Sequence, residues 1–231
     1  MSGRHRILVV DDERPIRRLL HTSLTAEGYD VVEAETAAQG LAMAAREKPD
    51  ALLLDLGLPD QDGLDMLRQL REWSKVPVVV VTVRDNESEK VAALDAGADD
   101  YVTKPFGMRE LLARLRTALR HGTQAEVGAP VFVSGKLSVD LTKRRVCVDG
   151  QEVKLSPKEY DLLRLFVRHA GRVLTHQMIL REIWGPAHAD DTQYLRVYVG
   201  QLRQKLHDDS GEPTLIRTEP GVGYRFAEAN A

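Results

Sequence analysis

The sequence predicts two domains, an α/β domain with a doubly wound parallel sheet followed by a smaller α+β domain. Three observations predict this arrangement. Short apolar runs alternate with amphipathic helical patterns up to about residue 121, this alternation then stops in small, flexible residues, and short alternating strands with helices follow. Strict alternation of strands and helices favours βαβ units with right-handed crossovers and a sheet covered on both faces. A chain of 231 residues with 43% hydrophobic residues has enough apolar material for two modest cores.

The first domain, predicted over residues 1–121, has five strand patterns and five helix patterns. Runs such as VVVV suit strands that are buried on both faces of a parallel sheet. The predicted strands are RILVV (6–10), DVVEA (30–34), ALLLD (51–55), VPVVVVT (76–82) and DYVTK (100–104). The first helix is predicted to end at about residue 27, and the others cover TAAQGLAMAAREK (36–48), GLDMLRQLREW (63–73), ESEKVAALDAG (87–97) and GMRELLARLRTALRH (107–121).

The second domain is predicted over residues 131–228, after a linker at 122–130 where small, flexible residues replace the helical periodicity. It begins with the strand patterns VFVSGKLSVD (131–140) and KRRVCVDGQEVKL (143–155). Three helical patterns follow, SPKEYDLLRLFVRHAG (156–171), THQMILREIWG (175–185) and DTQYLRVYVGQLRQKLH (191–207). The closing TLIRTEPGVGYRF (214–226) predicts a β-hairpin around a Pro and Gly turn.

Charge and cysteine content limit the functional classes. The net charge of −3 divides into 17 basic against 21 acidic residues over 1–121 (−4) and 15 against 14 over 122–231 (+1). This balance does not demand a nucleic-acid partner, so such a partner must be argued from local patches. The single cysteine, Cys147, excludes an internal disulfide and a cysteine-rich metal site, and we expect it to be a structural strand residue. The apolar run near the N-terminus is too short for a signal peptide, so we expect a cytoplasmic protein.

Polar and charged residues follow the predicted strands of the first domain. Asp11 and Asp12 follow the first strand, Asp55 the third, Thr82 ends the fourth and Lys104 follows the fifth. In an open parallel sheet, ligands bind beyond the carboxyl ends of the strands, where the winding direction changes. With the strand order 2-1-3-4-5, the three carboxylates converge there. They would repel one another unless a cation lay among them, and oxygen ligands of high charge density suit Mg²⁺.

The same set predicts a phosphoryl acceptor. Lys104 offers a compact positive charge and Thr82 a hydroxyl donor, the groups needed around phosphoryl oxygens. Asp55 is the candidate acceptor because the Gly and Pro turn after it leaves its side chain open, and aspartate can attack phosphorus. Alone, Asp12 could be a helix N-cap, and Lys104 with Pro105 could simply mark the end of a strand. The prediction therefore rests on the whole set of residues.

The motifs DD (11–12), LDLGLPDQDG around Asp55, Thr82 and YVTKPF (101–106) resemble the receiver domain of two-component response regulators, a flavodoxin-like fold, over nearly all of residues 1–121. The resemblance implies that a sensor histidine kinase phosphorylates Asp55. It implies that Asp11, Asp12, Asp55 and the carbonyl of Gly57 hold Mg²⁺, and that Lys104 contacts the phosphoryl group. Thr82 and Tyr101 resemble the switch pair of this family, although Tyr101 alone could be an ordinary edge aromatic.

The third helical pattern of the second domain predicts a DNA-reading helix. One stripe of it is expected to face the core, namely Tyr194, Leu195, Tyr198, Val199, Leu202 and Leu206. Arg196, Arg203 and Lys205 are then expected to face outward together with Gln193, Gln201 and Gln204. Arg and Gln read guanine and adenine edges in the major groove, and Lys mostly binds phosphate. A polar helix face alone is usually only solvated. The hairpin residues Arg217, Thr218 and Arg225 strengthen the prediction because arginine there could reach a minor groove.

RTEPGVGYRF, the WG before the third helix and the LRQKL within it resemble the OmpR/PhoB class of winged-helix regulators over about 130–228. Where many relatives carry a basic pair before LR, this chain has Gly200 and Gln201, so their base contacts cannot be transferred there. The resemblance implies a homodimer on phosphorylation, through residues of suitable charge: Lys90, Asp99, Asp100, Glu110 and Arg114. Near the end of the fifth helix, a further arginine of the family is shifted or replaced, with Arg120 followed by His121.

Longer stretches, among them IWGPAHADDTQYLRVYVGQLRQKL (183–206), resemble the branch of this class that regulates potassium-uptake operons together with a sensor kinase. Two alternatives stay open. One is a Mg²⁺-dependent phosphohydrolase with Asp55 as nucleophile, although such enzymes commonly place a second acid two residues later, and Gly57 stands there. The other is a receiver whose second domain binds protein. The expectation is a promoter-binding transcriptional regulator, with RNA polymerase as a possible further partner, and not an enzyme.

Overall fold

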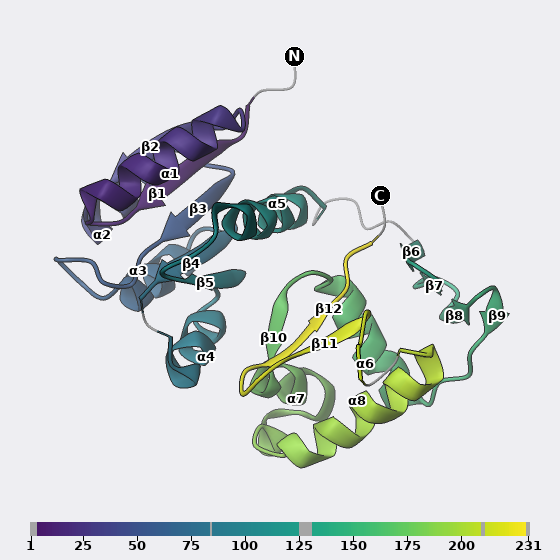
Figure 1. Ribbon diagram of the computed structural model, residues 1–231. Coiled ribbons are helices and arrows are strands. Elements are labelled where there is room, and N and C mark those ends of the chain that lie inside the picture. The colour runs from purple at the N-terminus through teal and green to yellow at the C-terminus, as the bar shows by residue number, and fades with distance from the viewer. Residues whose placement is uncertain (1–3, 84, 125–130, 209–210, 230–231) are drawn as a thin grey trace. The chain divides into compact units, whose positions relative to one another are not determined.

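The computed structural model describes residues 4–83, 85–124, 131–208 and 211–229 (Figure 1). The chain divides into two compact units between residues 127 and 128. The helix α5 (Met108–Gln124) continues into the segment expected to be linker, so the helical part of the first unit is longer than the sequence pattern indicated. The rest of that expected linker, 125–130, lies outside the described residues.

The first unit is a five-stranded parallel sheet in the order β2-β1-β3-β4-β5, which confirms the doubly wound fold and the strand order predicted from the sequence. Its strands are β1 (Arg6–Val10), β2 (Asp30–Ala34), β3 (Ala51–Leu54), β4 (Val78–Thr82) and β5 (Asp100–Thr103). Its other helices are α1 (Arg14–Ala26), α2 (Ala37–Glu47), α3 (Gly63–Arg71) and α4 (Glu87–Asp95).

Helices cover both faces of this sheet, because successive strand side chains point to opposite sides. Ile7 and Val9 of β1 pack in one core with residues of α1 and α5. Leu8 and Val10 pack in the other core with residues of α2, α3 and α4. All four side chains are fully buried. Burial on both faces explains why the strands read as continuous apolar runs, and it leaves the carboxyl ends of the strands as the open edge of the sheet.

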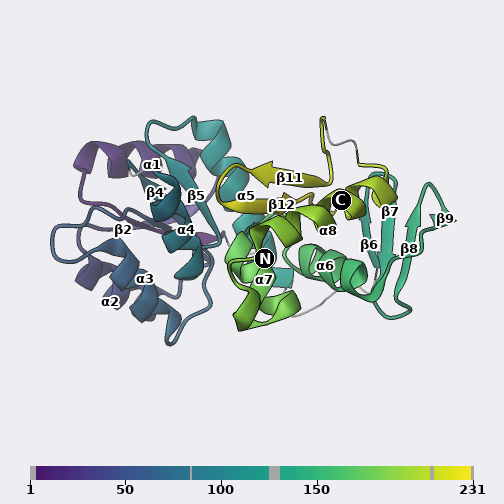
Figure 2. The same ribbon diagram turned by 90° about the horizontal axis from the view of Figure 1, so that it is seen from below.

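The second unit combines two antiparallel sheets with three main helices (Figure 2). The first sheet has the order β6-β7-β8-β9, with β6 (Val131–Ser134), β7 (Leu137–Asp140), β8 (Arg145–Val148) and β9 (Gln151–Glu152). The helices are α6 (Pro157–Arg168), α7 (His176–Trp184) and α8 (Thr192–Leu206), with the short 3-10 helix η1 (Pro186–His188) before α8. Cys147 lies half-buried on β8, so it is a strand residue as expected.

The predicted C-terminal hairpin is confirmed as β11 (Ile216–Glu219) and β12 (Gly223–Phe226). A third strand, β10 (Val173–Thr175), pairs with β12 and was not predicted, because a buried run of three residues between two helices has no detectable periodicity. A β-carbon on Gly223 would lie 1.9 Å from the carbonyl oxygen of Leu174, so only glycine allows this close strand pairing.

One core joins the helices and both sheets of the second unit. The ring of Phe166 on α6 stacks on Phe226 of β12, with centroids 5.7 Å apart, and Phe226 also contacts Phe132 of β6. From α8, Leu195, Val199, Leu202 and Leu206 are buried in this core. Tyr198 is half-buried and packs against this core as expected, whereas Tyr194 is exposed, so the expected core stripe was too wide at that residue. Both rings pack against Trp184.

Candidate metal centre and nucleic-acid interface

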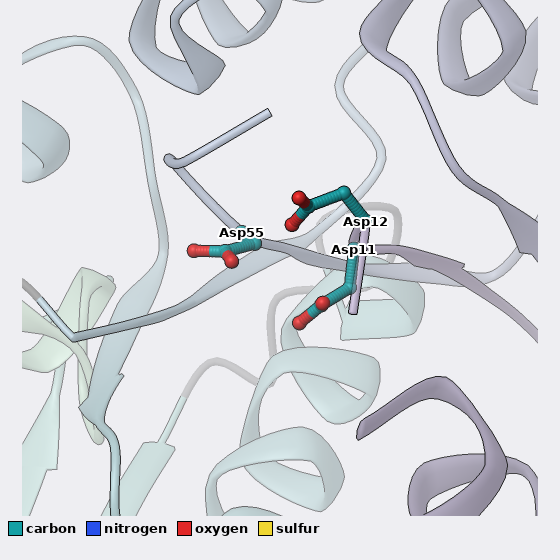
Figure 3. Close-up of side chains that lie close together, drawn as sticks. All are labelled: Asp11, Asp12 and Asp55. Atoms are coloured by element: carbon teal, nitrogen blue, oxygen red, sulfur yellow. The ribbon is translucent and has the colours of Figure 1, made fainter. Parts of the chain in front are cut away.

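Three carboxylates meet at the carboxyl edge of the sheet. Because β1 and β3 are parallel neighbours with Val10 opposite Leu54, the residues that follow them, Asp11 and Asp55, lie at the same edge. Asp11, Asp12 and Asp55 each offer a ligand atom within 4.8 Å of the others. Figure 3 shows the three side chains extending to the same side of this edge. The sequence-based expectation that these carboxylates converge is therefore confirmed.

Lys104, after β5, bridges the carboxylates. Its Nζ donates to Asp11 Oδ2 at 2.8 Å, to Asp55 Oδ2 at 2.9 Å and to Glu13 Oε1 at 3.0 Å. Burial works to lower the pKa of Lys104, but its hydrogen bonds to these carboxylates outweigh burial and raise that pKa above the ordinary 10.5. Burial also raises the pKa of Asp11 above 3.8, although Lys104 and the backbone N–H of Glu13 oppose this effect. The ammonium therefore stays charged among acids.

The donor set fits Mg²⁺. Asp11 and Asp55 are only 2% and 6% exposed, while Asp12 is open to solvent, so an ion would meet both fixed and accessible oxygens. One lysine offsets only part of the charge of the three aspartates and Glu13, and hard oxygen ligands of this charge density suit a divalent cation. The backbone N–H of Gly57 donates to Asp55 Oδ1 at 3.3 Å, which places Gly57 beside the same carboxylate.

The turn after Asp55 is held by local contacts. Asp62 caps α3 by accepting from the backbone N–H of Leu64, and Asp60 accepts from the N–H groups of Ala37 and Ala38 at the start of α2. A β-carbon on Gly63 would lie 2.4 Å from the carbonyl oxygen of Asp55, so α3 can begin this close to β3 only at glycine. These contacts fix the backbone that carries the candidate phosphoacceptor.

The two predicted switch residues lie on neighbouring strands. Thr82 ends β4 at the carboxyl edge and is 4% exposed. Tyr101 lies on β5, half-buried against the core, and the ammonium of Lys90 lies 5.3 Å from its ring centroid. Their movement as a switch stays a prediction.

Sequence reasoning missed Arg17, which is 5% exposed on α1. Its Nη1 donates to the carbonyl oxygens of Asp11 at 2.8 Å and Asp12 at 2.9 Å, and its guanidinium pairs with Glu35 and, at 3.5 Å, with Glu33. Arg17 therefore holds the backbone of both candidate metal ligands. The available signal was its spacing from Leu20 and Leu24, since an arginine stood where the helical period calls for a buried residue.

The expectation that all three basic residues of α8 face outward is only partly met, because Arg203 and Lys205 are half-buried and make contacts within the second unit. Arg203 Nε donates to the carbonyl oxygen of Ile216 at 3.1 Å and its Nη2 to Thr218 Oγ1 at 2.9 Å, so it ties α8 to β11. Lys205 Nζ contacts Glu159 Oε2 at 2.6 Å, which ties α8 to the capping box of α6. Both side chains remain half-exposed, and their polar ends bond to buried acceptors that lie within reach.

Other predicted contact residues of the second unit differ in accessibility. Arg225 is also held internally, by Glu219 at 2.7 Å and by the carbonyl oxygen of Gly171 at 2.8 Å. The remaining predicted contacts are exposed, namely Arg196 and Gln201 on α8 and Arg217 and Thr218 on β11.

The residues proposed for a dimer interface also make contacts within the chain. Arg114 Nη1 donates to both carboxylate oxygens of Asp100, at 3.0 and 2.9 Å, and Arg114 pairs with Glu110. Asp99 is 8% exposed and accepts from Arg71 and from the backbone N–H of Val78, and Asp100 is 3% exposed, so both are held within the chain and their place at a dimer interface stays a prediction. Lys90 pairs with Asp85. The side chain of His121 lies outside the described residues.

Comparisons with known proteins agree with this geometry. Residues 7–116 match the response regulator receiver domain, and residues 150–226 match the C-terminal domain of transcriptional regulatory proteins. A solved structure of the response regulator DrrB, an OmpR/PhoB homologue of Thermotoga maritima, aligns with 97% of this chain and 100% of its own, at 28% identity and a TM-score of 0.51. The chain belongs to the OmpR/PhoB class of response regulators.

This response regulator is similar to several proteins named KdpE. It is 51% identical to the transcriptional regulatory protein KdpE of Mycobacterium tuberculosis over 221 residues, which cover 95% of this chain and 98% of the relative. It is 49% identical to the KDP operon transcriptional regulatory protein KdpE of Escherichia coli over 220 residues, again 95% and 98% of the two chains. These matches do not favour the phosphohydrolase alternative. Among the described residues of the response regulator, no helix is long and apolar enough to cross a membrane.

Proposed function

We propose that Asp55 accepts a phosphoryl group from a cognate, KdpD-like sensor histidine kinase in the cytoplasm, and that the phosphorylated protein dimerises and binds the promoter of a potassium-uptake (kdp) operon. The observation that carries this proposal is the convergence of Asp11, Asp12 and Asp55 with Lys104 at the sheet edge, in a chain whose second unit is a winged helix. The KdpE names of the relatives support the operon.

The transfer uses residues of this chain. An oxygen of the Asp55 carboxylate attacks phosphorus as the bond to the kinase histidine breaks, and the phosphoryl group moves without a change of oxidation state. Mg²⁺, held by Asp11, Asp12, Asp55 and the carbonyl of Gly57, would offset the negative charge on the phosphoryl oxygens. Lys104 would pair with a phosphoryl oxygen, because its ammonium already contacts Asp55 at 2.9 Å. The Thr82 hydroxyl, at the end of the neighbouring strand β4, would donate a hydrogen bond to another phosphoryl oxygen.

Gly57 supports a phospho-aspartate that persists over one that turns over. A glycine two residues after Asp55 provides no second acid to protonate a leaving group or activate water. The protein would therefore store the phosphoryl group as a signal and not hydrolyse phosphoesters in steady turnover.

After phosphorylation, two surfaces of the protein are proposed to act, one in dimerisation and one in DNA binding. Dimerisation would use Lys90 of α4, Asp99 and Asp100 at the start of β5, and Glu110 and Arg114 of α5. Their present pairs within the chain would be exchanged for pairs across a two-fold axis. DNA contact would use the exposed Arg196 and Gln201 on α8 for base edges, and Arg217 and Thr218 on β11 for phosphate or minor groove. RNA polymerase is a further proposed partner.

Labelling and DNA binding test the proposal together. Acetyl phosphate with Mg²⁺ should label the wild-type protein, raise its dimer fraction in sedimentation and tighten its binding to promoter DNA. Asp55→Asn should lose the label and both gains, whereas Asp65→Asn, which changes an exposed aspartate of α3, should keep them. Labelling of Asp55→Asn at the wild-type level would show that another carboxylate is the acceptor. A DNA affinity that does not change with salt concentration would contradict the proposed contacts with phosphate groups.

A further inference from the structure

The exposed face of α8 contains a glycine, Gly200, whose presence is not explained by contacts among the residues that the structure describes. Gly200 lies in the middle of this helix, which is continuous from Thr192 to Leu206. Glycine in a helix interior costs about 1 kcal/mol relative to alanine. A glycine at such a position is therefore expected to be required by the backbone conformation, by packing inside the protein or by an external partner.

Backbone conformation gives no such reason. Gly200 has helical geometry within α8 and is absent from the glycines with positive φ. Alanine would therefore suit its backbone without strain.

Internal packing gives no reason either. Apart from its chain neighbours and the backbone of α8 itself, a β-carbon on Gly200 would meet no atom of the described residues within 4 Å. Gly40 in the middle of α2 is the opposite case, because a β-carbon there would lie 2.7 Å from Met66 Cε and 3.0 Å from Val10 Cγ2. Gly40 is required by the core, whereas Gly200 faces open space.

The neighbours of Gly200 on the helix indicate what approaches it. Residues three and four positions away share its face, and these are Arg196, Val197, Arg203 and Gln204. Arg196, Val197 and Gln204 are exposed, and Val197 exposes 52% of its surface although it is apolar. Because Arg203 is half-buried and bonded to Ile216, the exposed part of this face combines a cation, an amide and an uncovered aliphatic group around a position without a side chain. The combination matches the floor of a DNA major groove, where donors, acceptors and thymine methyl groups alternate.

We propose that Gly200 is the point of closest approach between α8 and operator DNA, and that the absence of a β-carbon there is a determinant of affinity and specificity. The bare helix backbone would let the groove edge come close enough for Val197 to contact base methyl groups and for Gln204 to reach base edges. This inference rests on the proposed function of α8 as the DNA-reading helix.

The test compares Gly200→Ala with the wild type on duplexes that the phosphorylated wild-type protein selects from a random-sequence DNA library. Gly107→Ala is the matched control, because Gly107 lies in the first unit, is exposed, and would also carry a β-carbon with no atom within 4 Å. We expect Gly200→Ala to raise the unfolding midpoint of the second unit and to weaken DNA binding about tenfold, the loss that one mismatched base pair can cause. Gly107→Ala should bind as the wild type does.

The outcomes separate this inference from the proposed function. Wild-type affinity in a well-folded Gly200→Ala would overturn it, and so would a lowered unfolding midpoint, because the glycine would then serve the fold. Equal loss of affinity for selected and unrelated duplexes would overturn the claim on specificity. If the wild-type protein itself selected no DNA, the proposed function would fail and not only this inference.

Discussion

The ammonium of Lys104 lies 2.9 Å from a carboxylate oxygen of Asp55, and both side chains are only 7% exposed. The same nitrogen contacts Asp11 at 2.8 Å. Lys104 therefore offsets part of the charge of the acidic cluster and lies next to the proposed phosphoacceptor. One side chain thus connects the stability of the fold with the chemistry of the site.

Replacement of Lys104 by methionine should destabilise the first unit when metal is removed. The change leaves Asp11 and Asp55 buried without their cation, and breaking a buried ion pair in this way costs about 3 kcal/mol. The free energy of unfolding from urea titration in EDTA is the measurement, and added Mg²⁺ should restore part of the loss. Arg68→Met is the control, since its pair with Asp65 is exposed on both sides and should contribute under ~1 kcal/mol. Equal losses in the two variants would contradict the role given to Lys104.

Replacement of Arg17 by methionine should weaken Mg²⁺ binding while the fold persists. Arg17 donates to the carbonyl oxygens of Asp11 and Asp12 and so orients both proposed ligands without touching the ion. Loss of such outer contacts typically lowers metal affinity by about 10- to 100-fold. Calorimetric titration with MgCl₂ measures the change, and the adjacent, exposed Arg18→Met should titrate as the wild type does. If Arg17→Met bound Mg²⁺ with unchanged affinity, Arg17 would be a residue of the fold alone.

The sequence was sufficient to predict the carboxylate cluster because parallel strands bring their carboxyl ends to one edge. Alternation gave the parallel sheet, and with the strand order 2-1-3-4-5 Asp11 and Asp55 had to meet there. Alternation does not fix that order, which entered as an assumption and is confirmed by the structure. The C-terminal hairpin was predicted from its strand pattern and turn residues.

Side-chain direction was not predictable in the same way. Arg203 reaches the carbonyl oxygen of Ile216, thirteen positions away in the chain, so its partner exists only after β11 has packed beside α8. Lys205 likewise finds Glu159 on another helix. Periodicity states which face of a helix carries polar residues, but a long flexible cation can leave that face to meet a buried acceptor.

Arg203 and Arg217 should therefore respond differently to alanine. Arg203→Ala removes hydrogen bonds to Ile216 and Thr218, so we expect the free energy of unfolding of the second unit to fall by about 1 to 2 kcal/mol. Arg217→Ala should leave that free energy unchanged, because Arg217 is exposed on β11. Arg217→Ala should instead weaken binding to all DNA sequences about equally. It should also reduce the slope of log binding constant against log salt concentration by about 1 in magnitude. Thermal unfolding and anisotropy titrations at several salt concentrations provide both readouts. Full stability of Arg203→Ala with loss of selectivity for one base would restore its first interpretation as a base reader.

Glu159 should make the stability of the second unit depend on pH in the acidic range. Burial works to raise the pKa of its carboxyl, but hydrogen bonds from Lys205 and from the backbone N–H and hydroxyl of Ser156 outweigh burial, so the pKa lies below the ordinary 4.5. A lowered folded-state pKa means that the unfolded chain binds the proton more readily. The stabilisation is therefore fully present above about pH 4.5 and is lost as the pH falls through the folded-state pKa.

Glu159→Gln keeps the shape of the side chain and removes its charge. Near pH 7 we expect this variant to be less stable by about 1.5 kcal/mol, the contribution of a hydrogen bond to a charged group. The difference from the wild type should shrink as the pH falls below 4.5, because the protonated carboxyl loses the same interaction. Urea unfolding at a series of pH values measures it, and Glu182→Gln, at an exposed position of α7, should show no such convergence. A difference that stayed constant between pH 7 and pH 3 would show that the capping geometry, and not the charge on Glu159, stabilises the junction of α6 and α8.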